Sequence, residues 1–133
     1  METTASRSTQ RAEVTLTVPA ESIYLSVVRT AAAGLAARLD FTLDDIEDLR
    51  IAVDEACALL LKQARSDTRV RCEFRVAEQV LGVRAIAVCD RPSVPPRDGF
   101  SWTVLAALTS SLDMEVQDHE LIINLTRGRA SDE

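Results

Sequence analysis

The 133-residue sequence predicts a two-layer α/β (α+β) sandwich, in which helices cover one face of a mixed, mostly antiparallel sheet. Its length is that of one domain with one hydrophobic core. Its apolar residues also switch several times between the 3.6-residue spacing of a helix and the alternation of a strand. The resulting order of elements is strand, helix, helix, strand, strand, helix, strand, strand.

The first half of the chain predicts one strand and two helices. Residues 14–18 alternate apolar side chains with threonines, as a half-buried strand does, and a helix is predicted over 20–39. A second helix begins after Thr42, which can cap it, with Asp45 three residues later as in a capping box. The predicted buried stripes are Ile23, Val27, Ala31, Leu35 and Leu39 in the first helix, and Ile46, Leu49, Val53, Ala56 and Leu60 in the second.

The second half of the chain predicts two pairs of strands around one helix. Strands are predicted over 70–76 and 80–89, and Gly82 is predicted to lie at a bulge or a close approach. Residues 90–99 contain three prolines and therefore predict a loop. A helix over 100–111 and a hairpin of strands 112–116 and 121–125 complete the pattern.

The ends of the chain are polar and small, so we expect a single domain over 13–127 between disordered tails, 1–12 and 128–133. A net charge of −6 predicts no direct nucleic-acid partner, because binding to phosphates needs a basic face. No apolar run is long enough for a membrane span and no signal peptide is present, which predicts a cytoplasmic protein.

The candidate metal ligands have simple structural explanations. Cys57, Cys72 and Cys89 are odd in number, far apart and within apolar stretches, which predicts reduced thiols packed in the core. His119 stands alone in a predicted turn, with no cysteine or carboxylate at ligand spacing. The sequence therefore predicts no metal site from these residues.

Three segments, in this order, resemble the anti-sigma kinases of the RsbW/SpoIIAB family, especially actinobacterial members: VPAESIYLSVVRTAAAGLAARLDF, LDDIEDLRIAVDEAC and FSWTVLAALTSSLDMEV. The resemblance covers nearly the whole predicted domain. It implies the GHKL (Bergerat) fold of histidine-kinase-like ATPases and a homodimer that regulates transcription in a stress response. It also implies a sigma factor as client, release by a STAS-type anti-sigma antagonist, and ATP-dependent serine/threonine phosphorylation of that antagonist.

The first nucleotide-binding box of the family is Glu-x-x-x-Asn, in which the Glu is the general base and the Asn ligates magnesium. The matching residues are Glu55 and Leu59. Magnesium prefers oxygen ligands, and a leucine offers none, so both magnesium and ATP use are doubtful here. Glu55 is either an inherited catalytic residue or an ordinary helix carboxylate.

The second box, Asp-x-Gly-x-Gly, matches at Asp90, the residue that takes the adenine amino group, but Pro92 and Val94 replace its glycines. The third, Gly-x-Gly, which cradles phosphate, matches at Gly99, and Ser101 replaces its second glycine. Asp90 and Gly99 are either cofactor-binding residues or simple turn residues. The eight residues between them are too few for both an adenine loop and a long lid.

Arg29 matches an arginine that contacts the sigma factor in the family, and we expect its guanidinium to be free to reach a carboxylate; the alternative is an ordinary solvated arginine. The favoured function is an anti-sigma factor that sequesters a sigma factor, is controlled by an antagonist, and has weakened or lost ATP use. One alternative is an active serine/threonine protein kinase that phosphorylates the antagonist, so enzyme activity stays open. The other is a non-catalytic dimeric adaptor of the same fold.

Overall fold

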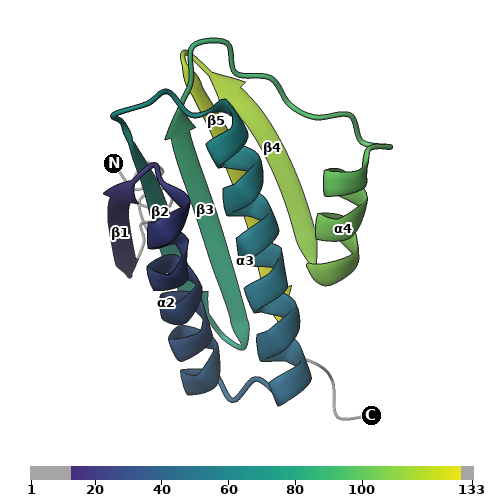
Figure 1. Ribbon diagram of the computed structural model, residues 1–133. Coiled ribbons are helices and arrows are strands. Elements are labelled where there is room, and N and C mark those ends of the chain that lie inside the picture. The colour runs from purple at the N-terminus through teal and green to yellow at the C-terminus, as the bar shows by residue number, and fades with distance from the viewer. Residues whose placement is uncertain (1–12, 130–133) are drawn as a thin grey trace, which may run out of the picture.

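The computed structural model describes residues 13–129, which form a layer of helices on one face of a five-stranded sheet (Figure 1). The order of the elements confirms the predicted order. In chain order they are β1 (Val14–Pro19), the 3-10 turn η1 (Ser22–Tyr24), α2 (Leu25–Arg38), α3 (Leu43–Gln63), β2 (Arg69–Ala77), β3 (Val80–Val88), α4 (Phe100–Leu108), β4 (Ser111–Gln117) and β5 (Glu120–Gly128).

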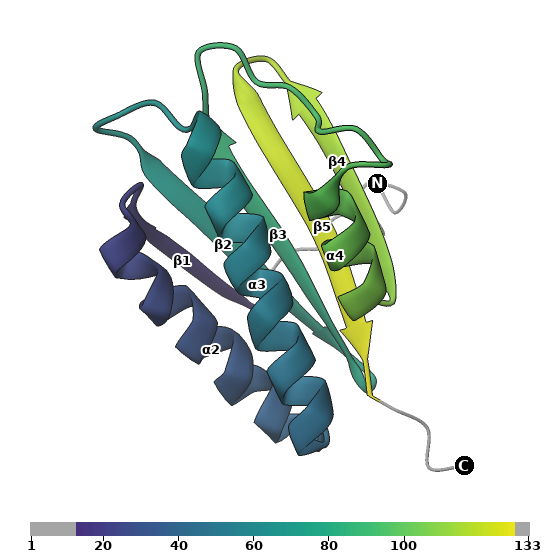
Figure 2. The same ribbon diagram turned by 45° about the vertical axis from the view of Figure 1, so that its right-hand side comes forward.

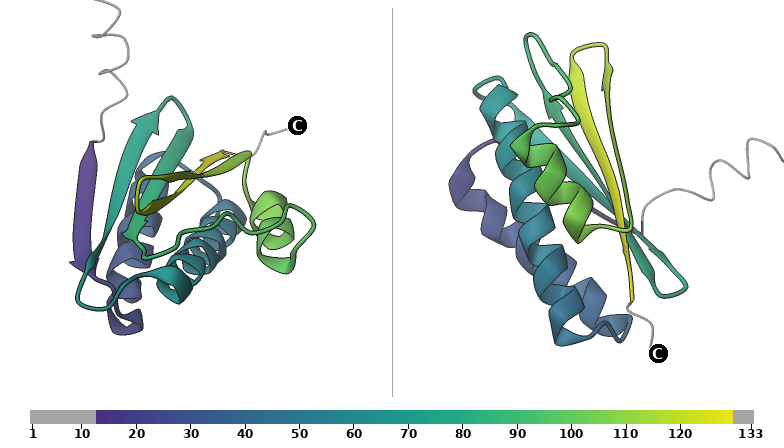
Figure 3. Two further views of the ribbon diagram at one scale, coloured as in Figure 1. Left: turned by 90° about the horizontal axis from the view of Figure 1, so that it is seen from above. Right: turned by 90° about the vertical axis from the view of Figure 1, so that its right-hand side faces the viewer.

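The sheet has the strand order β1-β2-β3-β5-β4, and all of these neighbours pair antiparallel, so the sheet is not mixed as predicted. Figures 2 and 3 show that α2, α3 and α4 lie on one face only. Gly82 pairs in register with Arg75 and Thr126. A Cβ added there would lie 3.7 Å from its nearest neighbour, an ordinary contact. The predicted bulge or close approach at Gly82 is therefore wrong.

The core lies between the helices and the sheet. Side chains in register across the sheet, such as Phe74, Val83 and Leu125, point to the helical layer and are buried. Each large side chain that is fully buried contributes about 1.5–3 kcal/mol relative to exposure. All three cysteines are free thiols within this core, which confirms the prediction for them.

The buried face of α2 is shifted from the predicted one. Val28 and Ala32 are fully buried, whereas Ile23 and Val27 are 74% and 47% exposed. The other residues of the predicted stripe pack against the core and are partly buried: Ala31, Leu35 and Leu39. Ile23 lies in η1, before the α-helix begins at Leu25. Two rows of apolar residues at a spacing of four run along this segment, and the spacing alone does not decide between them. The outward side of α2 is therefore more apolar than expected.

Helix α3 begins as predicted. The Thr42 hydroxyl accepts from the backbone N–H of Asp45 at 3.1 Å, and the Asp45 carboxylate accepts from the N–H of Thr42 at 3.4 Å. This reciprocal capping box satisfies two N–H groups that the first turn leaves without helical partners. The predicted stripe is confirmed, with Leu49, Val53, Ala56 and Leu60 buried and Ile46 partly buried.

A buried ion pair joins α3 to the other half of the fold. Asp45 is 1% exposed, and Arg127 on β5 donates to its Oδ1 at 2.7 Å. Arg127 also lies 3.2 Å from Asp48 and donates to the carbonyl of Leu108 at the end of α4. One guanidinium thus fixes the start of α3, the end of α4 and β5 relative to each other.

Two predicted boundaries need correction. Helix α4 ends at Leu108, three residues early, because the chain turns into β4 at Ser111. The last residue of β5 is Gly128, whose N–H donates to the Ser110 hydroxyl, so the strand extends into the predicted tail. The remaining tail residues, 1–12 and 130–133, lie outside the described residues. No helix between residues 13 and 129 is both long and apolar enough to cross a bilayer.

Candidate functional site

Glu55 lies on α3 opposite the first turn of α4, and the structure brings it to the segment that begins at Gly99. Its Oε2 accepts a hydrogen bond from the Ser101 hydroxyl at 3.1 Å, and both side chains are partly buried. A hydrogen bond to a carboxylate is stronger than one between neutral groups. The retained carboxylate is therefore held by a serine of the same chain, at the position where the family has its second phosphate-loop glycine.

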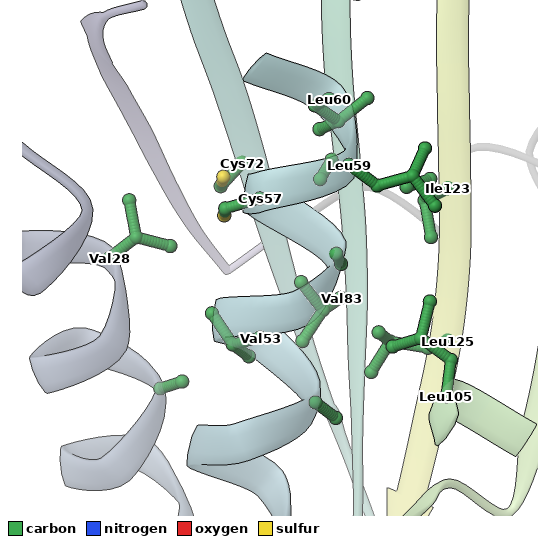
Figure 4. Close-up of a cluster of buried hydrophobic side chains, with 14 of the residues drawn as sticks. Val28, Val53, Cys57, Leu59, Leu60, Cys72, Val83, Leu105, Ile123 and Leu125 are labelled. Atoms are coloured by element: carbon green, nitrogen blue, oxygen red, sulfur yellow. The ribbon is translucent and has the colours of Figure 1, made fainter. Parts of the chain in front are cut away.

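Leu59 lies one turn after Glu55 and is 6% exposed, within the cluster of buried side chains in Figure 4. It offers no oxygen to a cation, and its side chain contributes to the packing of the core. Magnesium needs oxygen ligands in a near-octahedral arrangement. The residues present at this position therefore do not fit a magnesium ion.

Gly99 is the N-cap residue of α4 and has an ordinary negative φ of −83°. Its N–H donates to the carbonyl of Pro96 at 2.9 Å, and a Cβ at Gly99 would lie 3.1 Å from that same oxygen. A side chain at this position would require the loop to shift by a few tenths of an ångström. Next to it, the guanidinium of Arg97 lies 4.4 Å from the ring centroid of the buried Trp102. Gly99 thus forms the tight turn that starts α4.

Asp90 follows β3, as predicted, but it is not joined to Glu55 or Ser101 by a hydrogen bond. Its Oδ1 lies 3.6 Å from Arg65, and the side chain is 76% exposed. An exposed ion pair of this kind contributes about 0–1 kcal/mol. Asp90 is therefore not part of the hydrogen-bonded pair of Glu55 and Ser101 that joins α3 to α4.

Gln63, which the sequence did not single out, holds the loop over 90–99. Its Nε2 donates to the carbonyl of Ser93, and its Oε1 accepts from the N–H of the same residue, both at 2.9 Å. One side-chain amide thus satisfies both backbone groups of Ser93. No sequence motif indicates this contact, because it joins residues 30 apart whose proximity depends on the fold.

Arg29 lies on α2 beside α3, where its guanidinium faces a carboxylate of the same chain. Its Nε lies 3.5 Å from Oδ1 of Asp54 on α3, and the Arg29 side chain is 32% exposed. Val27, two residues earlier, lies on the opposite flank of α2 and is 47% exposed. Ile23, in η1, is 74% exposed.

Together, the polar groups around the end of α3 have partners within the protein. Glu55 is held by Ser101, Ser93 by Gln63, and Asp90 faces Arg65. Phosphoryl transfer relies on metal ions that neutralise charge and on groups that position the phosphates. The arrangement supplies one carboxylate, that of Glu55, and no oxygen ligand at Leu59.

Comparison with known proteins adds independent information. No protein-family model matches the chain. It is 34% identical, over 99 residues, to the "Anti-sigma-F factor RsbW" of Mycobacterium tuberculosis, a match that covers 74% of this chain and 59% of that protein. It is 41% identical, over 73 residues, to the "Serine-protein kinase RsbW" of Bacillus velezensis, covering 53% of this chain and 46% of that protein.

A third relative, the "Serine-protein kinase RsbW" of Halalkalibacterium halodurans, is 49% identical over 51 residues, which are 38% of this chain and 32% of that protein. The chain therefore matches less than two thirds of the length of each of these relatives.

Proposed function

Because the chain belongs to the RsbW/SpoIIAB family of anti-sigma factors, we propose that it sequesters a sigma factor, is controlled by a STAS-type anti-sigma antagonist, and uses ATP weakly or not at all. Its five-stranded sheet with helices on one face agrees with the GHKL-type fold of that family. The names of its relatives support the two partners, and the chemistry of α3 supports the loss of ATP use.

One observation carries the second half of the proposal: Leu59 is buried in the core where a magnesium ligand would be needed. The carboxylate of Glu55, one turn earlier, accepts a hydrogen bond from the Ser101 hydroxyl. Since charge neutralisation and positioning make up most of the catalysis of phosphoryl transfer, losing a metal ligand removes much of it.

The client surface that we propose is the outward side of η1 and α2, together with Arg29. Ile23 and Val27 offer exposed apolar area, and Arg29 offers a guanidinium that can reach a carboxylate by exchanging its partner Asp54. Apolar anchors and arginines are both enriched among the residues that contribute most to protein interfaces. A sigma-factor segment with an acidic residue beside apolar ones would match this surface.

Co-purification tests the binding function. The tagged chain is co-expressed with each alternative sigma factor of the same genome, and the affinity of any captured pair is measured by calorimetry without nucleotide. We expect one sigma factor to bind, and the antagonist to displace it. Failure to bind any of them would favour the adaptor function.

The kinase remains the second candidate function, because Glu55 is retained and two of the relatives bear the name serine-protein kinase. Transfer of the γ-phosphate from labelled ATP to a serine or threonine of the antagonist would establish it. We expect no transfer above the level of a Glu55→Gln variant.

We further propose a homodimer formed through β1. This strand is at the edge of the sheet, so one of its sides has unpaired backbone groups, and such edges tend to pair. Light scattering across a range of concentrations tests the dimer. A monomer at the highest concentration would contradict it.

A further inference from the structure

Two of the three cysteines face each other across the core. Cys57 lies on α3 and Cys72 on β2, and Figure 4 shows their sulfur atoms next to each other. The two thiols interact with each other, and their residues are 2% and 0% exposed. Cys89 has different surroundings, since its thiol donates to the carbonyl of Ala87. The core therefore contains one thiol pair and one separate thiol.

The two thiols of the pair affect each other's protonation. The interaction with Cys72, and then burial, raises the pKa of the Cys57 thiol well above its ordinary value. The nucleophilic form of a thiol is the thiolate, so either member of the pair reacts once it has lost its proton. Burial raises the pKa of Cys89, which has no thiol neighbour of this kind.

We propose that Cys57 and Cys72 form a dithiol that a peroxide oxidises to a disulfide between α3 and β2. The thiolate of one of the two cysteines attacks one peroxide oxygen, the O–O bond breaks, and that cysteine becomes a sulfenic acid while the other oxygen leaves as water. The sulfur of the second cysteine then attacks the sulfenic sulfur, the S–O bond breaks, and a second water leaves. The two thiols lose two electrons, two protons pass to the departing oxygens, and one peroxide is reduced to two waters.

Two free thiols are farther apart than the bonded separation of about 2.05 Å, so the two sulfur atoms must approach each other to close the bond. Burial means that the peroxide reaches the pair when the core opens locally, which makes the reaction slow but does not change its product. The disulfide would then connect the helix that carries Glu55 directly to the second strand of the sheet.

The sequence provides an internal control. Cys57 and Cys72 are 15 residues apart and Cys72 and Cys89 are 17 apart, so the two loops cost nearly the same entropy to close in an unfolded chain. Oxidation in concentrated urea should therefore give both disulfides in comparable amounts. A strong preference for Cys57–Cys72 under native conditions can come only from the fold.

The experiment uses the full chain. Native protein is incubated with hydrogen peroxide, the peroxide is removed with catalase, and the protein is unfolded in guanidinium with iodoacetamide and analysed by mass spectrometry. We expect the alkylated thiols to fall from three to one, with the label on Cys89 and a Cys57–Cys72 disulfide in the peptide map. That disulfide should exceed Cys72–Cys89 by at least about tenfold, unlike the mixture in urea. Dithiothreitol should restore all three labels.

Two variants complete the test. Cys89→Ser should form the disulfide at the rate of the unchanged protein, and Cys57→Ser should form none. Three of the outcomes would overturn the proposal: alkylation of all three thiols after oxidation, native disulfides that involve Cys89 as often as in urea, or peroxide products that stop at sulfinic acid. The peptide map of the oxidised, unchanged chain tests the proposal even if Cys57→Ser folds poorly.

Discussion

The first turn of α3 and its second half use polar side chains in different ways. At its start, the Thr42 and Asp45 capping box is complete, and the buried carboxylate of Asp45 is held by Arg127. From the middle of the helix onwards, the carboxylate of Glu55 accepts from a serine hydroxyl, and Leu59 adds to the core. Polar contacts thus join α3 to other elements at its start, whereas Leu59 contributes apolar packing and offers no oxygen to a metal.

The largest effect should come from breaking the start of α3. Arg127→Ala leaves Asp45 without its guanidinium at 1% exposure, and removing one partner of a buried pair costs about 3–5 kcal/mol. We expect the free energy of unfolding, measured in urea, to fall by that amount. Arg50→Ala removes a half-exposed pair with Glu47 and should cost about 0–1 kcal/mol. Equal, small effects of both variants would show that the buried pair does not anchor the fold.

At the other end, Leu59→Asn introduces the missing amide at a buried position. It should lower the free energy of unfolding by about 2–5 kcal/mol, because a buried Leu is lost and a polar group is buried. Leu60→Asn is matched in burial and serves as the control for stability. Neither variant should phosphorylate the antagonist, since Pro92 still gives the loop a different backbone. Robust phosphorylation by Leu59→Asn alone would show that the missing metal ligand at this position is sufficient to explain the lack of kinase activity.

Arg29 pairs with Asp54 in the middle of α3. Its substitution tests whether this side chain belongs to the proposed client surface. Arg29→Ala should change stability by less than about 1 kcal/mol, because both side chains of the pair are partly exposed. It should weaken sigma-factor binding by about 1.5–3 kcal/mol, the range for a hydrogen bond to a charged group. Arg29→Lys should recover part of the loss, since an ammonium has no bidentate fork.

Calorimetric titration of the sigma factor measures this effect, and Arg50→Ala provides a matched surface arginine. Unchanged binding by Arg29→Ala would place the client surface elsewhere on the molecule.

The smallest expected effect on stability comes from removing one hydroxyl group, either that of Thr42 or that of Ser101. Thr42→Ala removes the cap of α3 and should cost about 1 kcal/mol. Ser101→Ala removes the hydrogen bond to Glu55, which is partly exposed, and should cost about 0.5 kcal/mol. Thermal unfolding of both variants under one buffer condition measures the difference. A larger loss for Ser101→Ala would mean that the α3–α4 contact contributes to the fold as much as the cap does.

Local signals made most of the fold predictable. The capping box lies within four residues, and the apolar alternation of each strand is a property of that strand alone. Helix α2 shows the limit: Val27 and Val28 both begin an apolar row, and only packing against α3 and the sheet selects Val28.

The candidate site was predictable only in part. The family resemblance indicates Glu55, Asp90 and Gly99. In the structure, Glu55 is hydrogen-bonded to Ser101, which lies in the segment that begins at Gly99. The partners Ser101, Gln63 and Arg65 depend on segments far apart in the sequence. Such contacts follow from the tertiary fold, and no local pattern in one sequence specifies them.

The central claim is that the end of α3 no longer binds ATP through magnesium. Titration of ATP into the protein by calorimetry, once with excess magnesium and once with excess chelator, tests it most directly. Because Leu59 offers no metal ligand, we predict weak binding whose affinity is the same in both conditions. Tight binding that is lost with the chelator would contradict the claim.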